Sequence, residues 1–137
     1  MQKVKTDSRF VIKYWLPPIL WGLVIFSFSS LQVGKSSEIY WKDFVVKKTA
    51  HLVEYAIFTI LLYRAMVGSN VDKKKAIIIS IIIAALYGLT DEFHQSFTPG
   101  REPRIRDVII DTIGSAVGVT LFQKILERNP KWAEKFL

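Results

Sequence analysis

Four apolar stretches, each close to the length of a membrane-spanning helix, limit what this chain can form more than any other feature. The stretches cover residues 14–31, 49–67, 76–97 and 105–125. A helix needs about 20 mostly apolar residues to cross the hydrocarbon core of a bilayer. Runs of isoleucine such as 77–79 also suit strands, but isolated apolar strands would leave unpaired backbone groups in lipid. We therefore predict an all-α integral membrane bundle of four transmembrane helices, with residues 1–137 forming a single domain.

The first apolar stretch has features of both a membrane anchor and a signal peptide. Basic residues precede it, and the small residues Ser27 and Ser29 follow its apolar core, as they do in cleavable signal peptides. Pro17, Pro18 and Trp21 are unusual in such a segment, whereas the two prolines suit the first turn of a helix. We expect a retained anchor; cleavage would leave three helices in the same orientation.

Charge orients the bundle and narrows the class of protein. Half of the 137 residues are hydrophobic, yet the formal charge is +7. The positive charge lies between the apolar stretches rather than on one basic stripe, which argues against nucleic-acid binding and makes anionic lipid head groups the natural partners of the loops. With a cytoplasmic N-terminus, twelve of the 19 lysines and arginines lie inside and seven outside, so the bias predicts an N-in/C-in topology. The absence of cysteine excludes disulfides and thiolate metal sites.

Eight ionisable residues in or beside the apolar stretches fall, in this topology, at the outer end of the bundle. They are His51, Glu54, Asp91, Glu92, His94, Arg101, Asp107 and Asp111. Charged groups at membrane depth are costly, so they usually face a bundle interior or a wet cavity and mark a functional site. We therefore expect a polar site between the outer ends of the helices.

The spacing of these residues supports one common site. Three sets have helical spacing: His51 with Glu54, Asp91 with His94 and Gln95, and Asp107 with Asp111. Residues three or four apart share a helix face, and the outer ends of antiparallel neighbours lie at the same membrane height. A turn at Pro99-Gly100 follows the third stretch and would deliver arginines above the carboxylates. The arginines are Arg101, Arg104 and Arg106, and their side chains bind phosphate or carboxylate with two parallel hydrogen bonds.

Several of these residues also have a structural interpretation. Glu92 is adjacent to Asp91, so it points elsewhere and could be solvated. His51 could be a packing residue, and Asp107 and Arg104 could be ordinary charges of the membrane interface. The coincidence of three helices that each carry polar residues at one level favours a site over these alternatives.

The segments that carry these residues resemble the VanZ-like family of bacterial membrane proteins. The resemblance rests on residues 47–55 (KKTAHLVEY), 90–101 (TDEFHQSFTPGR) and 107–114 (DVIIDTIG), and it covers about residues 10–125. Asp111 stands where the family usually has asparagine, which adds a carboxylate to the site. The resemblance implies a multi-pass protein of the bacterial cytoplasmic membrane, associated with resistance to the glycopeptide teicoplanin. A housekeeping role in the cell envelope is an alternative.

One hypothesis for the site is binding of a lipid-linked or phosphate-bearing envelope molecule. The ligand-binding residues would be His51, Glu54, Asp91, Glu92, Gln95, Arg101, Arg106, Asp107 and Asp111. The arginines would hold a phosphate, and the other side chains would orient the ligand or bind its sugar or peptide part. The expected partners are membrane lipids and a lipid-linked cell-wall precursor or a lipoglycopeptide. Gly114 and Gly118 form a G-x-x-x-G pattern, which serves helix packing within the chain or a homodimer seam.

A second hypothesis is an intramembrane hydrolase or transferase that acts on a lipid phosphate or amide. His51, Glu54, Asp91 and His94 would then be catalytic, with a histidine as general base or nucleophile. Two histidines and several carboxylates could also hold a divalent metal that activates water. A third hypothesis is a purely structural ionic network, although such networks contribute little to stability when buried.

Overall fold

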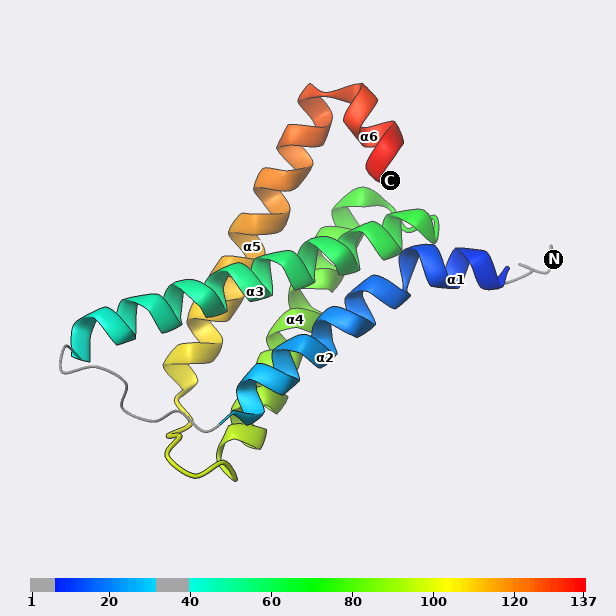
Figure 1. Cartoon of the computed structure of the whole chain (residues 1–137). Coiled ribbons are helices and arrows are strands. Elements are labelled where there is room, and N and C mark those ends of the chain that lie inside the picture. Colours follow the sequence, from blue (N-terminus) through cyan, green and yellow to red (C-terminus); the bar gives the residue numbers. More distant parts are fainter. Residues whose placement is uncertain (1–6, 32–39) are drawn as a thin grey trace.

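The computed structural model describes residues 7–31 and 40–137, and all regular structure in these residues is helical, as predicted. Its helices are α1 (Ser8–Tyr14), α2 (Leu16–Ser30), α3 (Tyr40–Gly68), α4 (Lys73–Gln95), α5 (Ile105–Arg128) and α6 (Pro130–Phe136). The four longer helices form a bundle in which α5 crosses α3 obliquely and α6 turns back toward α1 (Figure 1). At one end of the bundle α2 and α4 end while α3 and α5 begin; we call this the site end.

Three helices of the described chain are long and apolar enough to cross a membrane. They are α3 from Phe44 onward, α4 and α5. The pair α1 and α2 bends by 44° and makes a fourth span if it is counted as one broken helix. As predicted, Pro17 and Pro18 lie in the first turn of α2, where their missing N–H groups have no intrahelical role.

The helix boundaries differ from the prediction where polar residues occupy the first turns. α3 begins at Tyr40, nine residues before the predicted start at 49, because residues 40–48 contain neither glycine nor proline to end a helix. α4 begins at Lys73 rather than 76, since the Asp72 carboxylate accepts the N–H groups of Lys74 and Lys75. α5 continues to Arg128, and α6 was not predicted. The apolar stretches therefore predict the positions of the spans well, but they do not predict the polar residues at which the helices begin and end.

Close contact between α3 and α5 depends on two glycines. A Cβ added at Gly114 would lie 2.7 Å from the Leu52 carbonyl oxygen, and one added at Gly118 would lie 2.6 Å from the Ala56 Cβ. The glycines thus let the two backbones approach closely, which is the packing role considered for the G-x-x-x-G pattern. Because α3 covers this face, a homodimer would have to use another surface, and dimerisation stays a prediction.

An aromatic cluster joins α2, α3 and α4 below the site end. Tyr55 is completely buried, and the rings of Phe58 and Tyr87 lie 5.0 Å apart. The Tyr87 hydroxyl donates a hydrogen bond of 2.5 Å to the carbonyl oxygen of Gly22, which attaches α4 to α2. These contacts hold the helix ends that carry the polar residues at a common level.

Candidate functional site

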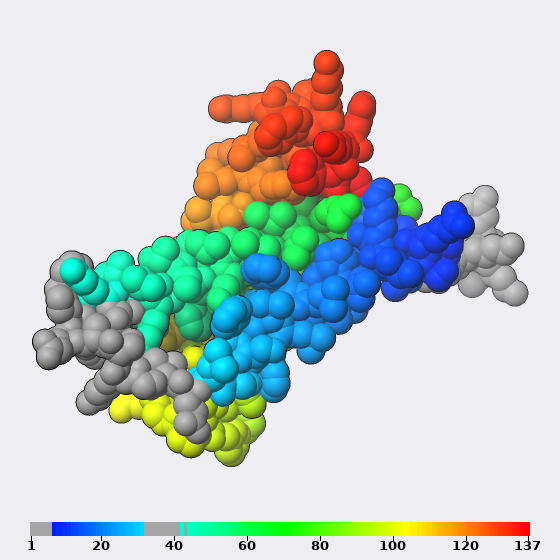
Figure 2. All heavy atoms as spheres, viewed as in Figure 1, coloured from blue at the N-terminus to red at the C-terminus, as the bar shows by residue number. Residues whose placement is uncertain are grey.

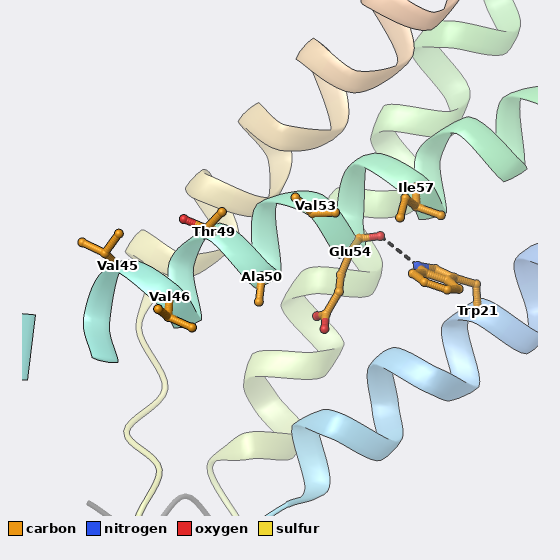
Figure 3. Close-up of a pocket in the computed structure, with 8 residues that line it drawn as sticks. All are labelled: Trp21, Val45, Val46, Thr49, Ala50, Val53, Glu54 and Ile57. Carbon is orange, nitrogen blue, oxygen red and sulfur yellow. Dashed lines mark hydrogen bonds between the residues drawn. The ribbon is translucent and has the colours of Figure 1, made fainter. Parts of the chain in front are cut away.

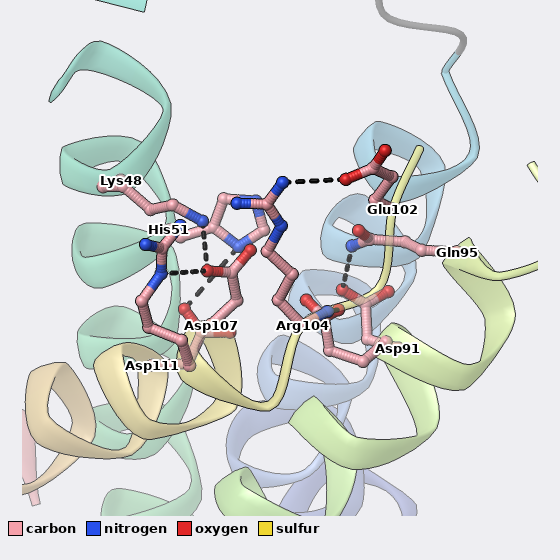
Figure 4. Close-up of polar contacts among 10 residues, drawn as sticks. Lys48, His51, Asp91, Gln95, Glu102, Arg104, Asp107 and Asp111 are labelled. Atoms are coloured by element: carbon pink, nitrogen blue, oxygen red, sulfur yellow. Dashed lines mark hydrogen bonds and ion pairs between the residues drawn. The ribbon is translucent and has the colours of Figure 1, made fainter. Parts of the chain in front are cut away.

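Polar side chains from α3, α4, α5 and the loop between α4 and α5 converge at the site end (Figure 4). We call the inner group the polar site; it comprises Lys48, His51, Asp91, Gln95, Asp107 and Asp111. The prediction that three helices bring polar residues to one level is therefore confirmed by the geometry. Lys48 was missed, because it precedes the predicted helix start although it lies three residues before His51 on the same face.

Basic side chains on α3 face the two aspartates of α5. Lys48 forms an ion pair with Asp107, and the Arg106 Nε lies 3.8 Å from the same carboxylate oxygen. One turn deeper, the His51 Nδ1 lies 3.6 Å from Asp111 Oδ1, and the Asp111 side chain is only 2% exposed. The aspartates thus share one helix face, as predicted, and each is matched by a separate group on α3.

On α4 the predicted pair of Asp91 and Gln95 is confirmed. Both residues are buried, and the Gln95 Nε2 donates a hydrogen bond of 3.1 Å to Asp91 Oδ2. His94 does not join them, although it is also within one turn of Asp91. Its Nε2 lies 3.0 Å from the Ser30 hydroxyl oxygen, and its ring stacks on Phe26 at 4.3 Å. His94 therefore connects α4 to α2 rather than facing the carboxylates.

Glu92 is buried and not solvated, which corrects one of the alternatives considered for it. Its side chain accepts a hydrogen bond of 2.8 Å from the backbone N–H of Arg104, the residue that caps α5. A carboxylate at this position also interacts favourably with the positive end of the helix dipole. Glu92 thus fixes where α5 begins, and through it the positions of the aspartates one and two turns into that helix.

The three arginines have different positions. Arg101 donates hydrogen bonds to the carbonyl oxygens of Phe28 (3.0 Å) and Leu31 (3.3 Å), so in the described chain its guanidinium binds the end of α2 rather than a carboxylate of the polar site. Arg104 contacts Glu102 at 2.7 Å in an exposed pair of the loop. Arg106 is half exposed, reaches Asp107 and lies over the ring of an α3 phenylalanine. Arg106 is thus the arginine placed beside a site carboxylate, as predicted for it.

Among the buried oxygens of the polar site and the neighbouring Tyr55, four make no hydrogen bond with the described residues. Asp107 Oδ1 and Asp111 Oδ1 lie in the ion-pair contacts with Lys48 and His51, whereas Asp91 Oδ1 and the Tyr55 hydroxyl have neither kind of contact. Buried polar groups in proteins are nearly always satisfied by protein atoms or water. The site therefore retains hydrogen-bonding capacity, mainly for groups that donate. Tyr55 was not predicted as a site residue, although it ends the first motif.

The metal hypothesis receives no support from the described side chains. Among the side chains that the structure describes, no three from histidine, aspartate or glutamate come close enough together to hold a metal ion. His51 and Asp111 form a pair without a third ligand, and His94 faces α2. We therefore derive no chemistry through a metal.

Glu54 lies apart from these pairs, in an open groove of about 520 Å³ between α2 and α3 (Figure 3). The other residues that line this groove are Trp21, Val45, Val46, Thr49, Ala50, Val53 and Ile57. The Trp21 indole N–H donates a hydrogen bond of 2.9 Å to the Glu54 carbonyl oxygen. His51 and Glu54, predicted to share a face, thus point to different neighbours.

Comparison with known proteins gives one match. A family model described as VanZ/LLP1 matches residues 3–127, a range that contains all residues of the polar site and all three motifs. No curated protein and no solved structure gave a significant match. The apolar helices and the family together indicate a membrane protein of the cell envelope. Because the match covers nearly the whole length of the sequence, the chain belongs to the VanZ/LLP1 family.

Proposed function

We propose that this protein is a multi-pass protein of the bacterial cytoplasmic membrane, oriented N-in/C-in, whose outward-facing polar site binds a lipid-linked or phosphate-bearing envelope molecule. The observation that carries the proposal is the coexistence of a cationic rim and buried acceptor oxygens at one end of a membrane bundle. Ionisable groups at this depth usually serve a ligand or a transport path.

The rim supplies the groups that a phosphate requires. Lys48 and Arg106 both lie beside Asp107, and their side chains are 19% and 51% exposed, so each can be reached from solvent. Ammonium and guanidinium groups form strong charge-assisted hydrogen bonds to phosphate oxygens. A phosphate would compete with Asp107 for these cations without requiring a change in the helices.

The buried part of the polar site supplies groups that can bind the rest of the ligand's head group. Asp91 keeps a buried carboxylate oxygen without a hydrogen-bond partner among the described residues, and the buried Tyr55 hydroxyl also lacks one. Asp111 Oδ1 makes no hydrogen bond either, although the His51 Nδ1 lies 3.6 Å from it. Carboxylates accept hydrogen bonds only, so the matching ligand groups are hydroxyls or N–H groups, as in a sugar or a peptide. A phosphate linked to a sugar or peptide satisfies both halves of the site.

The link between the VanZ family and teicoplanin resistance fits this proposal. A lipid-linked cell-wall precursor carries a phosphate, sugars and a peptide, and teicoplanin is a lipoglycopeptide directed at that precursor. An outward-facing site that binds either molecule would affect the encounter between drug and target.

Thermal unfolding of the purified protein in detergent tests the proposal. The additives are a polyprenyl phosphate, the lipid-linked peptidoglycan precursor, teicoplanin and divalent metals. A ligand at 100 times its dissociation constant stabilises the folded state by about 2.7 kcal/mol, which raises the midpoint measurably. We expect Lys48→Gln to abolish the shift and Lys47→Gln, which removes the same charge at an exposed neighbouring position, to preserve it. Absence of any shift, or equal loss in both variants, contradicts the proposal.

A hydrolase or transferase acting on a lipid phosphate or amide is the second candidate. The pair of His51 and Asp111 favours it, because a carboxylate at one ring nitrogen orients an imidazole for proton transfer at the other. The other predicted catalytic residues, Glu54 and His94, face the groove and α2 respectively. Release of phosphate or amine from these lipids, lost in His51→Ala with binding retained, would establish an enzyme.

A further inference from the structure

The groove between α2 and α3 has the character of a site for a hydrocarbon chain. Apart from Thr49 and Glu54 its lining is apolar, and its volume of about 520 Å³ falls within the range of about 300–1,000 Å³ that is usual for small-molecule sites. The Trp21 indole N–H is already bound to a backbone carbonyl. A polar occupant would leave most of its hydrogen-bonding groups unsatisfied there, whereas a hydrocarbon chain would not.

The position of the groove makes it accessible to lipid. It runs along the half of α3 nearest the site end, within the segment from Phe44 to Gly68 that can span a membrane. The side chains of Val46 and Val53 on its wall are 68% and 47% exposed. Because α2 and α3 lie side by side on one face of the molecule, a chain could enter sideways from the bilayer (Figure 2).

Glu54 connects the groove to the polar site. At about 100° per residue along a helix, it projects from α3 between the valines of the groove and His51. Its carboxylate lines the groove, and on the neighbouring side of the same helix His51 faces Asp111 of the polar site. An apolar compartment and a polar compartment therefore meet at this one side chain.

We propose that the groove holds the hydrocarbon chain of a single-chain lipid phosphate whose head occupies the polar site. The Glu54 carboxylate lies where chain and head meet, and accepts a hydrogen bond from a hydroxyl or N–H group of the head. This inference rests on the proposed function and narrows its ligand from any phosphate-bearing molecule to a lipid with one long chain. One groove accommodates one chain, which distinguishes this ligand from the two-chain phospholipids of the bilayer.

Two probes with the same head and different chains separate the groove from the polar site. They are isopentenyl phosphate, which is short and soluble, and farnesyl phosphate, whose chain is three times as long; affinities are measured in phosphatidylcholine nanodiscs. We expect the long probe to bind at least about tenfold more tightly to the unmodified protein. Val53→Trp should remove this preference by filling the groove and leave the affinity for the short probe unchanged.

Val117→Trp is the matched control, since Val117 lies on α5 and its side chain is 50% exposed, close to the 47% of Val53. It should leave both affinities unchanged. If Val53→Trp retains the preference for the long chain, or if the unmodified protein binds both probes equally, the groove proposal is overturned while the polar site stands. If neither probe binds while the lipid-linked precursor still raises the unfolding midpoint, the groove proposal is overturned and the proposed function stands. If none of these ligands binds, both are refuted.

A measurement on the unmodified protein guards against a variant that fails to fold. Farnesyl phosphate with a diazirine at the end of its chain is photolysed in the same nanodiscs, and the labelled peptides are identified. We expect label on α2 and on α3 between residues 45 and 57, in excess over the exposed apolar faces of α4 and α5. Equal labelling of all exposed faces would contradict the proposal.

Discussion

Replacing Arg101 with glutamine separates a structural role for this residue from a ligand-binding role. Its guanidinium donates hydrogen bonds of 3.0 and 3.3 Å to the carbonyl oxygens of Phe28 and Leu31. Each bond contributes about 0.5–1.5 kcal/mol, and a cation at a helix C-terminus adds about 0.3–1 kcal/mol. The loss should therefore total roughly 1.3–4 kcal/mol, and it should be confined to the last turn of α2.

Hydrogen exchange measures this local loss directly. Since about 1.4 kcal/mol corresponds to a factor of ten, the amides in the last turn of α2 should exchange roughly 10- to 1,000-fold faster in Arg101→Gln. Arg104→Gln is the matched control, because it removes the same charge from the same loop and its contact with Glu102 is an exposed pair of little energetic value. Phosphate-probe affinity should change little in either variant. Unchanged α2 exchange together with a large loss of affinity in Arg101→Gln would refute the capping argument and restore Arg101 as a ligand.

Two further predictions concern the contact between α3 and α5. Gly118→Ala should destabilise the protein by about 1–3 kcal/mol, because the new Cβ would lie 2.6 Å from that of Ala56. In thermal unfolding, the double variant with Ala56→Gly should recover most of this loss. No recovery would mean that the contact between these two residues is not the cause. The side chains of Lys48 and Asp107 are only 19% and 14% exposed. A double-mutant cycle of Lys48→Gln and Asp107→Asn should therefore give a coupling free energy of about 1–2 kcal/mol. The exposed pair of Arg104 and Glu102 should give almost none. Equal coupling in the two pairs would argue that burial does not strengthen the first.

The polar site was predictable where helical spacing alone determines the result. Asp91 and Gln95 are four residues apart on one helix, so their hydrogen bond follows from helix geometry. The level at which Asp107 meets Lys48 and Asp111 meets His51 follows from the antiparallel order of successive helices and from span lengths. Neither result depends on which helices are in contact.

Predictions failed where the result depends on which neighbour covers a helix face. His94 and Gln95 are both within one turn of Asp91, yet His94 turns to α2 because Phe26 and Ser30 lie there. Glu54 is three residues from His51 but faces the groove beside Trp21. The spacing of residues along a helix predicts which side chains share a face, but it does not predict which neighbouring helix packs against that face.

The sequence by itself determined the helical class, the three clear spans and the gathering of polar residues at one end, because these follow from apolar length and helical period. Only the tertiary structure decided the partners within that end. Gly114 and Gly118 bring α5 directly against α3, so the α5 aspartates meet Lys48 and His51. Arg101 is drawn instead to the carbonyl groups at the end of α2. Pairing between helices depends on backbone separation and crossing, which arise from packing of the whole bundle and are not encoded in the spacing of any one segment.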